Sequence, residues 1–149
     1  MSAELAAFIN DELAAMRRMA DELIERTRNF DEKPPDMWDL NAAGGMLQSF
    51  YTGVEGTLRA IAECAGEAVD KTGSWHSELL TGMTRPTSRR PAVLSVELAE
   101  RLREYLGFRH VVRSHYGFEL EWERMSPLVA ELDAVLIDLD SEIRRFFGA

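Results

Sequence analysis

Apolar residues recur along most of the chain at steps of three and four, which is the period of an amphipathic helix. Residues 2–29 form the clearest such segment, with acidic residues and arginines on the opposite face. Its apolar positions are Leu5, Ile9, Leu13, Met16, Met19 or Ala20, Leu23 and Ile24. Strand-like alternation of apolar and polar residues is hard to find in the sequence. The pattern therefore predicts an all-α protein.

A second long helix is predicted over residues 37–69. Pro34 and Pro35 end the first helix, because proline lacks a backbone donor and disfavours helical geometry in the residue before it. The apolar face of the second helix consists of Leu47, Phe50, Tyr51, Val54, Leu58 and Ile61. Its interior glycines are Gly44, Gly45, Gly53 and Gly56. Each weakens a helix by up to about 1 kcal/mol relative to alanine, so we expect a kink or a close helix approach there.

Three further helices are predicted in the second half of the chain. Ser74 is expected to cap a short helix over residues 75–83, and Ser95 a fourth helix that ends near Gly117. Residues 84–94, with two prolines and three arginines, predict a surface loop. The last helix is expected to begin at Ser126 and Pro127 and to carry a heptad-like apolar seam. We expect one domain, residues 1–149, folded as an up-and-down bundle of four or five helices.

Two arginines fall on the apolar stripe of the fourth predicted helix. At about 100° per residue, Arg109 and Arg113 lie within one arc of roughly 120° with the apolar positions. These positions are Leu98, Leu102, Tyr105, Leu106, Val112 and Tyr116. Burying a guanidinium costs several kcal/mol unless it is paired or faces an anion. Either acids of neighbouring helices pair with both arginines and Tyr116 is an ordinary core aromatic, or the stripe contributes to an anion site.

The distribution of charge favours a local anion site on an acidic chain. The formal net charge of −9 argues against a surface that coats nucleic acid generally. However, no acidic residue falls between Glu78 and Glu97 or between Glu104 and Glu119. The basic residues of these two windows are Arg85, Arg89 and Arg90, then Arg109, His110, Arg113 and His115. The alternative for the first three is that they only solvate a loop.

Several classes of protein are excluded or disfavoured by what the sequence contains. A single cysteine, Cys64, permits no intramolecular disulfide, and no apolar run reaches the roughly 20 residues that cross a bilayer. The start of the chain does not resemble a signal peptide, so we expect a cytoplasmic protein without membrane association. Three histidines with unsuitable spacing predict no metal site, and no nucleotide-binding motif is present. We therefore expect no metal and no other cofactor.

The remaining chemistry is concentrated in residues 109–120, which read Arg-His-x-x-Arg-x-x-Tyr-Gly-x-Glu-Leu. Upstream lie Trp75-His76-x-Glu78-Leu79-Leu80, then Arg90-Pro91-Ala92-Val93-Leu94 and Leu98-Ala99-Glu100-Arg101-Leu102. Together these segments resemble the HepT-like branch of the HEPN superfamily over most of residues 40–147. The resemblance implies a helical bundle that forms two-fold dimers. It also implies a metal-independent ribonuclease of the toxin type, paired with a minimal nucleotidyltransferase as antitoxin.

In such proteins an arginine followed after four to six residues by a histidine forms the catalytic motif at the dimer groove. Carried over to this chain, the motif arginine is Arg109 and the histidine is His115. In the common spacing the histidine would stand at position 114, where this chain has Ser114. A nearby tyrosine that the partner modifies with AMP corresponds to Tyr116.

The resemblance predicts that His115 takes the proton of a ribose 2′-hydroxyl, while Arg109, assisted by Arg113, stabilises the charge that develops on the phosphate. Possible further contacts to RNA are His110, Ser114, Arg85, Arg89 and Arg90. The alternative is a catalytically weak HEPN module that binds a nucleotidyltransferase partner or a nucleotide. A structural scaffold is the third possibility.

Overall fold

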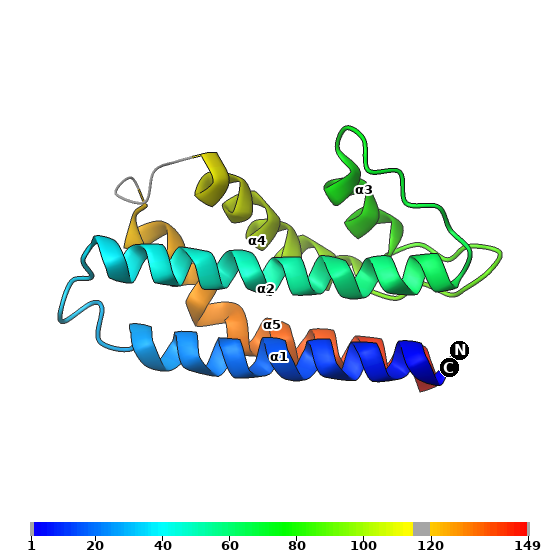
Figure 1. Cartoon of the computed structure of the whole chain (residues 1–149), viewed down its shortest axis with the longest axis horizontal. Helices are drawn as coiled ribbons and strands as arrows, with labels where there is room; N and C mark the ends of the chain where they lie inside the picture. The colour runs from blue at the N-terminus through cyan, green and yellow to red at the C-terminus, as the bar shows by residue number, and fades with distance from the viewer. Residues whose placement is uncertain (1, 115–119, 149) are drawn as a thin grey trace.

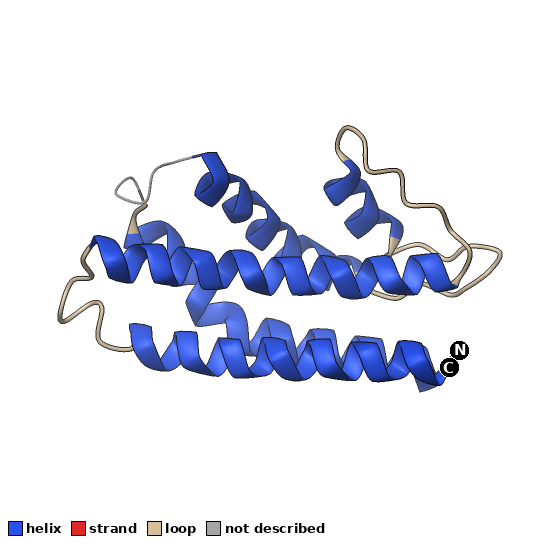
Figure 2. Ribbon diagram, viewed as in Figure 1, coloured by secondary structure: helices blue, strands red, loops and turns tan. Residues whose placement is uncertain are grey.

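The computed structural model describes residues 2–114 and 120–148, which form five helices. These are α1 (Ala3–Thr27), α2 (Met37–Cys64), α3 (Trp75–Gly82), α4 (Val96–Ser114) and α5 (Trp122–Gly148). Within the described residues the β-type pairing is limited to an isolated bridge between Thr87 and Arg90, and Figure 2 shows helices joined by loops. The prediction of an all-α protein is confirmed.

The long helices form a bundle with α3 on one side (Figure 1). α1 and α2 run in opposite directions, and α1 also packs against α5. α4 packs against both α2 and α5, so these four helices enclose the core. The short helix α3 contacts α2 and α4. The two ends of the chain lie close together at one end of the bundle (Figure 1).

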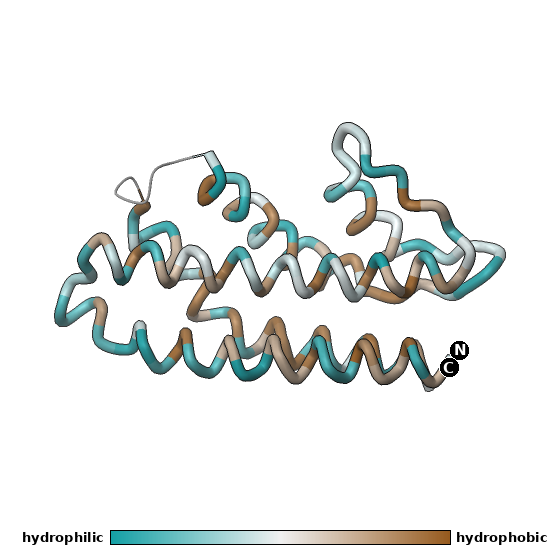
Figure 3. The backbone as a smooth tube through the Cα atoms, in the orientation of Figure 1, coloured by the Kyte–Doolittle hydropathy of each residue, from teal (hydrophilic) through white to brown (hydrophobic). Residues whose placement is uncertain are grey.

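The core follows the predicted apolar stripes, which Figure 3 shows as brown segments along the helices. Ile9 of α1, Leu47 of α2 and Leu102 of α4 are at most 2% exposed. Phe50 and Tyr105 join α2 to α4 through an edge-to-face contact with ring centroids 5.2 Å apart. Burial of these stripes, rather than helix propensity alone, is what stabilises helices of this length.

Two of the four glycines of α2 are sites of close approach. A Cβ added at Gly53 would lie 3.1 Å from Cγ of Met16 on α1, and one at Gly44 would lie 3.0 Å from Cδ1 of Leu120. At Gly45 and Gly56 an added Cβ would meet nothing within 4 Å. The expectation of a close approach is therefore confirmed at Gly44 and Gly53 only.

Capping side chains define several helix ends. Ser2 accepts a hydrogen bond from the backbone of Leu5 at 3.1 Å, and Ser95 accepts one from Leu98 at the same distance, as predicted for Ser95. Asp36 and Asp39 form a reciprocal capping box directly after the two prolines. Ser74 precedes α3 as predicted, but its hydroxyl donates to the carboxylate of Glu78 and makes no capping hydrogen bond.

Two predicted helix boundaries are wrong. α2 ends at Cys64 and not at residue 69, because Gly66 adopts a φ of +82° and the amides of Gly66 and Glu67 bond back to the last turn. This is the glycine-based helix termination of the Schellman type. α5 begins at Trp122, so Pro127 lies inside the helix. The indole of Trp122 donates to Asp31 and packs edge-on against Phe30, which anchors the additional turn.

None of the helices within the described residues combines the length and the apolar composition needed to cross a membrane. The predicted end of the fourth helix near Gly117 lies outside the described residues.

Candidate functional site

A buried carboxylate, Glu55, lies on the apolar face of α2. Its side chain is 8% exposed, and side chains from two other helices reach it. Nδ1 of His76, near the start of α3, lies 2.5 Å from Oε2, and Nη1 of Arg109, in α4, lies 3.6 Å from Oε1. We call these three residues the Glu55 cluster. It joins α2, α3 and α4, and it supplies the partners without which a buried carboxylate would strongly destabilise the fold.

The short contact between His76 and Glu55 determines which imidazole nitrogen carries a proton. An ionised carboxylate only accepts hydrogen bonds, so we assign the proton of this contact to Nδ1 of His76. Nδ1 then has no lone pair for Arg109, whose Nη1 lies 3.3 Å away. The indole of Trp75 stacks on the imidazole, with centroids 3.9 Å apart and planes inclined by 32°. His76 is therefore held in one orientation, with Nε2 as the nitrogen that does not face Glu55.

The guanidinium of Arg109 is fixed in place but has unused donors. Its side chain is 13% exposed, and its Nε is the one fully buried side-chain nitrogen or oxygen without a hydrogen-bond partner among the described residues. The contact of Nη1 with Glu55, at 3.6 Å, is an ion pair longer than a good hydrogen bond. Nη2 has no hydrogen bond to the described part of the chain. Such a group can bind an oxyanion, because guanidinium donors match carboxylate and phosphate oxygens.

Two further polar side chains, Arg103 and Tyr51, lie near the Glu55 cluster. Arg103 of α4 donates to the hydroxyls of Ser77, at 2.7 Å, and Thr81, at 2.9 Å, which ties α4 to α3. Tyr51 is 1% exposed. Burial and the Glu55 carboxylate raise the pKa of Tyr51, although the guanidinium groups of Arg103 and Arg109 oppose the shift. The phenol of Tyr51 therefore stays neutral across the physiological range of pH.

The other predicted residues that the structure describes in α4, which are His110, Arg113 and Ser114, are exposed and make no hydrogen bond or ion pair with this cluster in the described residues. Val112 contacts α2, 3.5 Å from the position of a Cβ added at Gly44, and Arg113, about 100° further around the helix, is exposed. The prediction that Arg113 faces the interior is therefore wrong, whereas the prediction for Arg109 is confirmed. His110 and Ser114 are exposed, and the Ser114 hydroxyl donates to the His110 carbonyl. The predicted residues His115 and Tyr116 lie outside the described residues.

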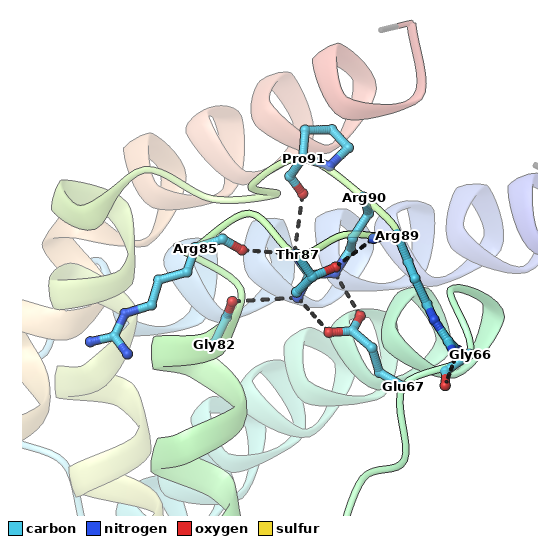
Figure 4. Close-up of polar contacts among 8 residues, drawn as sticks. All are labelled: Gly66, Glu67, Gly82, Arg85, Thr87, Arg89, Arg90 and Pro91. Carbon is cyan, nitrogen blue, oxygen red and sulfur yellow. Dashed lines mark hydrogen bonds and ion pairs between the residues drawn. The ribbon is translucent and has the colours of Figure 1, made fainter.

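Arg90, one of the three loop arginines, is buried and its hydrogen bonds stay within the protein (Figure 4). Nε and Nη2 donate to the two carboxylate oxygens of Glu67 at 2.6 and 3.0 Å. Nη1 donates to the carbonyls of Arg85 and Pro91 at 3.0 and 3.1 Å, and Nη2 reaches the carbonyl of Gly82 at 3.4 Å. The side chain thus stabilises its own loop and is not available to an external phosphate.

The neighbouring arginines are more accessible. Arg89 is exposed and donates Nη1 to the carbonyl of Gly66 at 2.7 Å. Arg85 is exposed, and its guanidinium extends away from the other labelled residues in Figure 4. Both remain candidates for contact with an anion. They do not adjoin the Glu55 cluster through any hydrogen bond or ion pair of the described residues.

Sequence reasoning missed Glu55 and His76. Glu55 follows Val54 and precedes Leu58 on the apolar face of α2, so the argument that singled out Arg109 applies equally to Glu55. His76 carried no comparable signal, because its proximity to Glu55 depends on how α3 packs. Among the described residues, no group of three or more His, Cys, Asp or Glu side chains could hold a metal ion.

The five-helix bundle and the motif at residues 109–120 define a protein of the HEPN class. A family model described as HepT-like protein matches residues 42–149, and the chain belongs to this family, a branch of the HEPN superfamily. The matched region spans α3, α4, α5 and most of α2, and it includes all three residues of the Glu55 cluster. No curated protein and no solved structure matches the chain.

Proposed function

We propose that this protein is a metal-independent endoribonuclease of the HepT-like toxin type. The observation that carries the proposal is the state of Arg109, the motif arginine of the family. Its guanidinium is held beside Glu55 and His76, yet its buried Nε has no partner. Nε itself is fully buried, but the side chain is 13% exposed and its Nη2 has no hydrogen bond to the described residues, so Nη2 could bind a phosphate of RNA, which supports a function in binding an oxyanion.

The reaction follows from the groups that RNA cleavage requires. Attack of a ribose 2′-oxygen on the adjacent phosphorus needs a base for the hydroxyl proton, and a histidine suits this task because its ordinary pKa is near 6.5. The family motif assigns this base to His115. Arg109 would stabilise the negative charge of the phosphorane-like transition state. Arg113, one turn further along α4 and exposed, would add positive charge where the RNA approaches.

The same proposal includes partners. A two-fold dimer would bring a second copy of these groups to a shared groove, and Arg85, Arg89, His110 and Ser114 are exposed residues that could contact the rest of the RNA. HepT-like proteins are generally part of toxin–antitoxin systems. A minimal nucleotidyltransferase would act as the antitoxin by transferring AMP to Tyr116, and both proteins would act in the cytoplasm.

The proposal is tested by incubating the purified protein with tRNA in EDTA. We expect cleavage by the wild type and a loss of at least about a hundredfold in Arg109→Gln and in His115→Ala. Arg26→Gln is the matched control, because Arg26 is an exposed arginine of α1 paired only with Glu22. Cleavage that persists in both motif variants, or an inactive wild type, would refute the proposal.

A catalytically weak module that binds a nucleotidyltransferase is the second candidate. The ion pair between Arg109 and Glu55 favours it, because a paired arginine also has a structural role. This candidate is tested by incubating the protein with ATP and a minimal nucleotidyltransferase of the proposed antitoxin type, followed by mass spectrometry. AMP on Tyr116 together with a stable complex, but without RNA cleavage, would support the module. An unmodified tyrosine and no complex would count against any such partnership.

A further inference from the structure

The Glu55 cluster contains a histidine to which the family motif assigns no task. His76 lies outside residues 109–120, on a different helix, and its side chain is 26% exposed. Its Nδ1 is bonded to Glu55, while Nε2 has no partner among the described residues. Nε2 of His76 is also absent from the fully buried polar side-chain atoms without a partner in the described residues, which consist of Arg109 Nε alone, and this agrees with the partial exposure of the imidazole. A histidine fixed by a carboxylate at one nitrogen and open at the other is built to transfer a proton.

We propose that His76 is the general acid of RNA cleavage, with Glu55 as its positioning residue. This inference rests on the proposed function, which supplies a base and an anion site but no group to protonate the leaving oxygen. Nη1 of Arg109 lies 3.3 Å from Nδ1 of His76, so a phosphate bound to this guanidinium would adjoin the imidazole ring. The charged groups that contact the His76 imidazole among the described residues are Glu55 of α2 and Arg109 of α4.

The proposed step begins with His76 as imidazolium. The 2′-oxygen forms a bond to phosphorus and loses its proton to the base, the bond between phosphorus and the 5′-oxygen breaks, and this oxygen takes the proton from Nε2. The products are a 2′,3′-cyclic phosphate, a 5′-hydroxyl and neutral His76. Nδ1 keeps its proton throughout, because the Glu55 carboxylate accepts from it. One proton enters and one leaves the protein, so the step is balanced.

Two features of the fold support this assignment. The indole of Trp75 lies against one face of the imidazole, and the Glu55 carboxylate fixes the ring edge, so little freedom has to be lost when RNA binds. Arg103 donates to two hydroxyls of α3, which holds the helix that carries His76 against α4. The histidine and the anion-binding arginine are therefore positioned relative to each other by the fold itself.

A leaving-group substitution provides the test. The substrates are one RNA and the same RNA with sulfur in place of the bridging 5′-oxygen at the cleavage site. A thiolate leaves without being protonated, so an enzyme that has lost its general acid should still cleave the sulfur substrate. We expect His76→Asn to lower the cleavage rate of the oxygen substrate by about 10²–10⁴-fold and to cleave the sulfur substrate within a few-fold of the wild type. Asparagine keeps a donor for Glu55 but has no proton to transfer.

Glu55→Gln should show the same dependence on the leaving group, with a smaller loss of cleavage rate on the oxygen substrate. Glu78→Gln is the control, because it changes an exposed carboxylate of α3, and it should cleave both substrates like the wild type. Partial unfolding of a variant lowers both rates equally, so the ratio of the two rates stays interpretable. Equal losses on both substrates in His76→Asn, or no loss on either, would overturn this inference while leaving the nuclease intact. A wild type that cleaves neither substrate would instead remove the proposed function, and this inference with it.

Discussion

Replacing Arg90 by alanine should destabilise the protein far more than the same change at its neighbour Arg89. Arg90 donates from all three guanidinium nitrogens, to both carboxylate oxygens of Glu67 and to backbone carbonyls of the loop between α3 and α4 (Figure 4). Its side chain is only 4% exposed. Arg89, by contrast, is exposed, and its side chain makes one hydrogen bond, to the carbonyl of Gly66.

The magnitude follows from what the substitution leaves behind. Removing one partner of a buried ion pair typically costs about 3–5 kcal/mol. The lower end applies here, because Glu67 is 25% exposed and can regain water once its partner is removed. A loss of about 3 kcal/mol corresponds to a decrease in Tm of about 6–12 °C, at about 2–4 °C per kcal/mol for a domain of this size. Arg89→Ala should cost less than about 1 kcal/mol.

The assay is thermal and urea unfolding of both variants, followed by circular dichroism at the helix band. Glu67→Ala, and the double variant with Arg90→Ala, complete a cycle that isolates the coupling between the two side chains. The reasoning fails if Arg90→Ala unfolds within 1 °C of the wild type, or if Arg89→Ala is equally damaging. Either result would mean that this loop does not depend on its buried arginine.

Further predictions concern glycines and tyrosines, and urea unfolding checks each. Gly66→Ala should lower the free energy of unfolding by about 1–2 kcal/mol because Gly66 has a positive φ, and an increase would refute this expectation. Gly56→Ala should raise the free energy of unfolding by up to about 1 kcal/mol, because the added Cβ would meet nothing within 4 Å in α2. Tyr105→Phe removes a hydroxyl that donates to an α5 carbonyl at 2.6 Å and should cost about 1 kcal/mol. Burial raises the pKa of Tyr51 and Tyr105, so the unfolded chain loses these protons first and stability should fall as the pH rises above about 10. A urea midpoint that stays constant from pH 9 to 11 would contradict this predicted loss of stability.

The periodicity of apolar residues is sufficient to predict the helices, because each stripe must be buried against another helix. The buried face of α1 and the capping hydrogen bond of Ser95 both follow from local sequence. The errors occur where tertiary contacts decide. Pro127 is typical of a helix start, but the contacts of Trp122 with residues after α1 extend α5 by a further turn.

The candidate site was predictable only in part, for the same reason. Arg109 can be recognised as a charged residue on the apolar stripe of α4, since this reasoning needs the sequence of one helix only. Arg113 shares that stripe on a helical wheel, but Val112 takes the position against α2. His76 meets Glu55 across 21 residues of sequence, and no periodicity within either helix encodes this contact. A site assembled from three helices thus requires the packing of the bundle before its members can be recognised.

The two largely buried arginines of this chain show how a structural guanidinium differs from one that can act on a ligand. Arg90 and Arg109 are 4% and 13% exposed, and each has a glutamate as partner. Arg90 donates five hydrogen bonds within the protein, two of them to Glu67, so its guanidinium has no donor left for a ligand. At Glu55, His76 takes the short contact, and Arg109 is left at 3.6 Å with an unpaired Nε. If stability alone determined this second pair, a direct bidentate contact would be favoured over an unsatisfied buried donor. The short contact of His76 with Glu55 therefore leaves Arg109 without a short hydrogen-bond partner on this carboxylate, which is the arrangement that the proposed binding of a phosphate by its guanidinium requires.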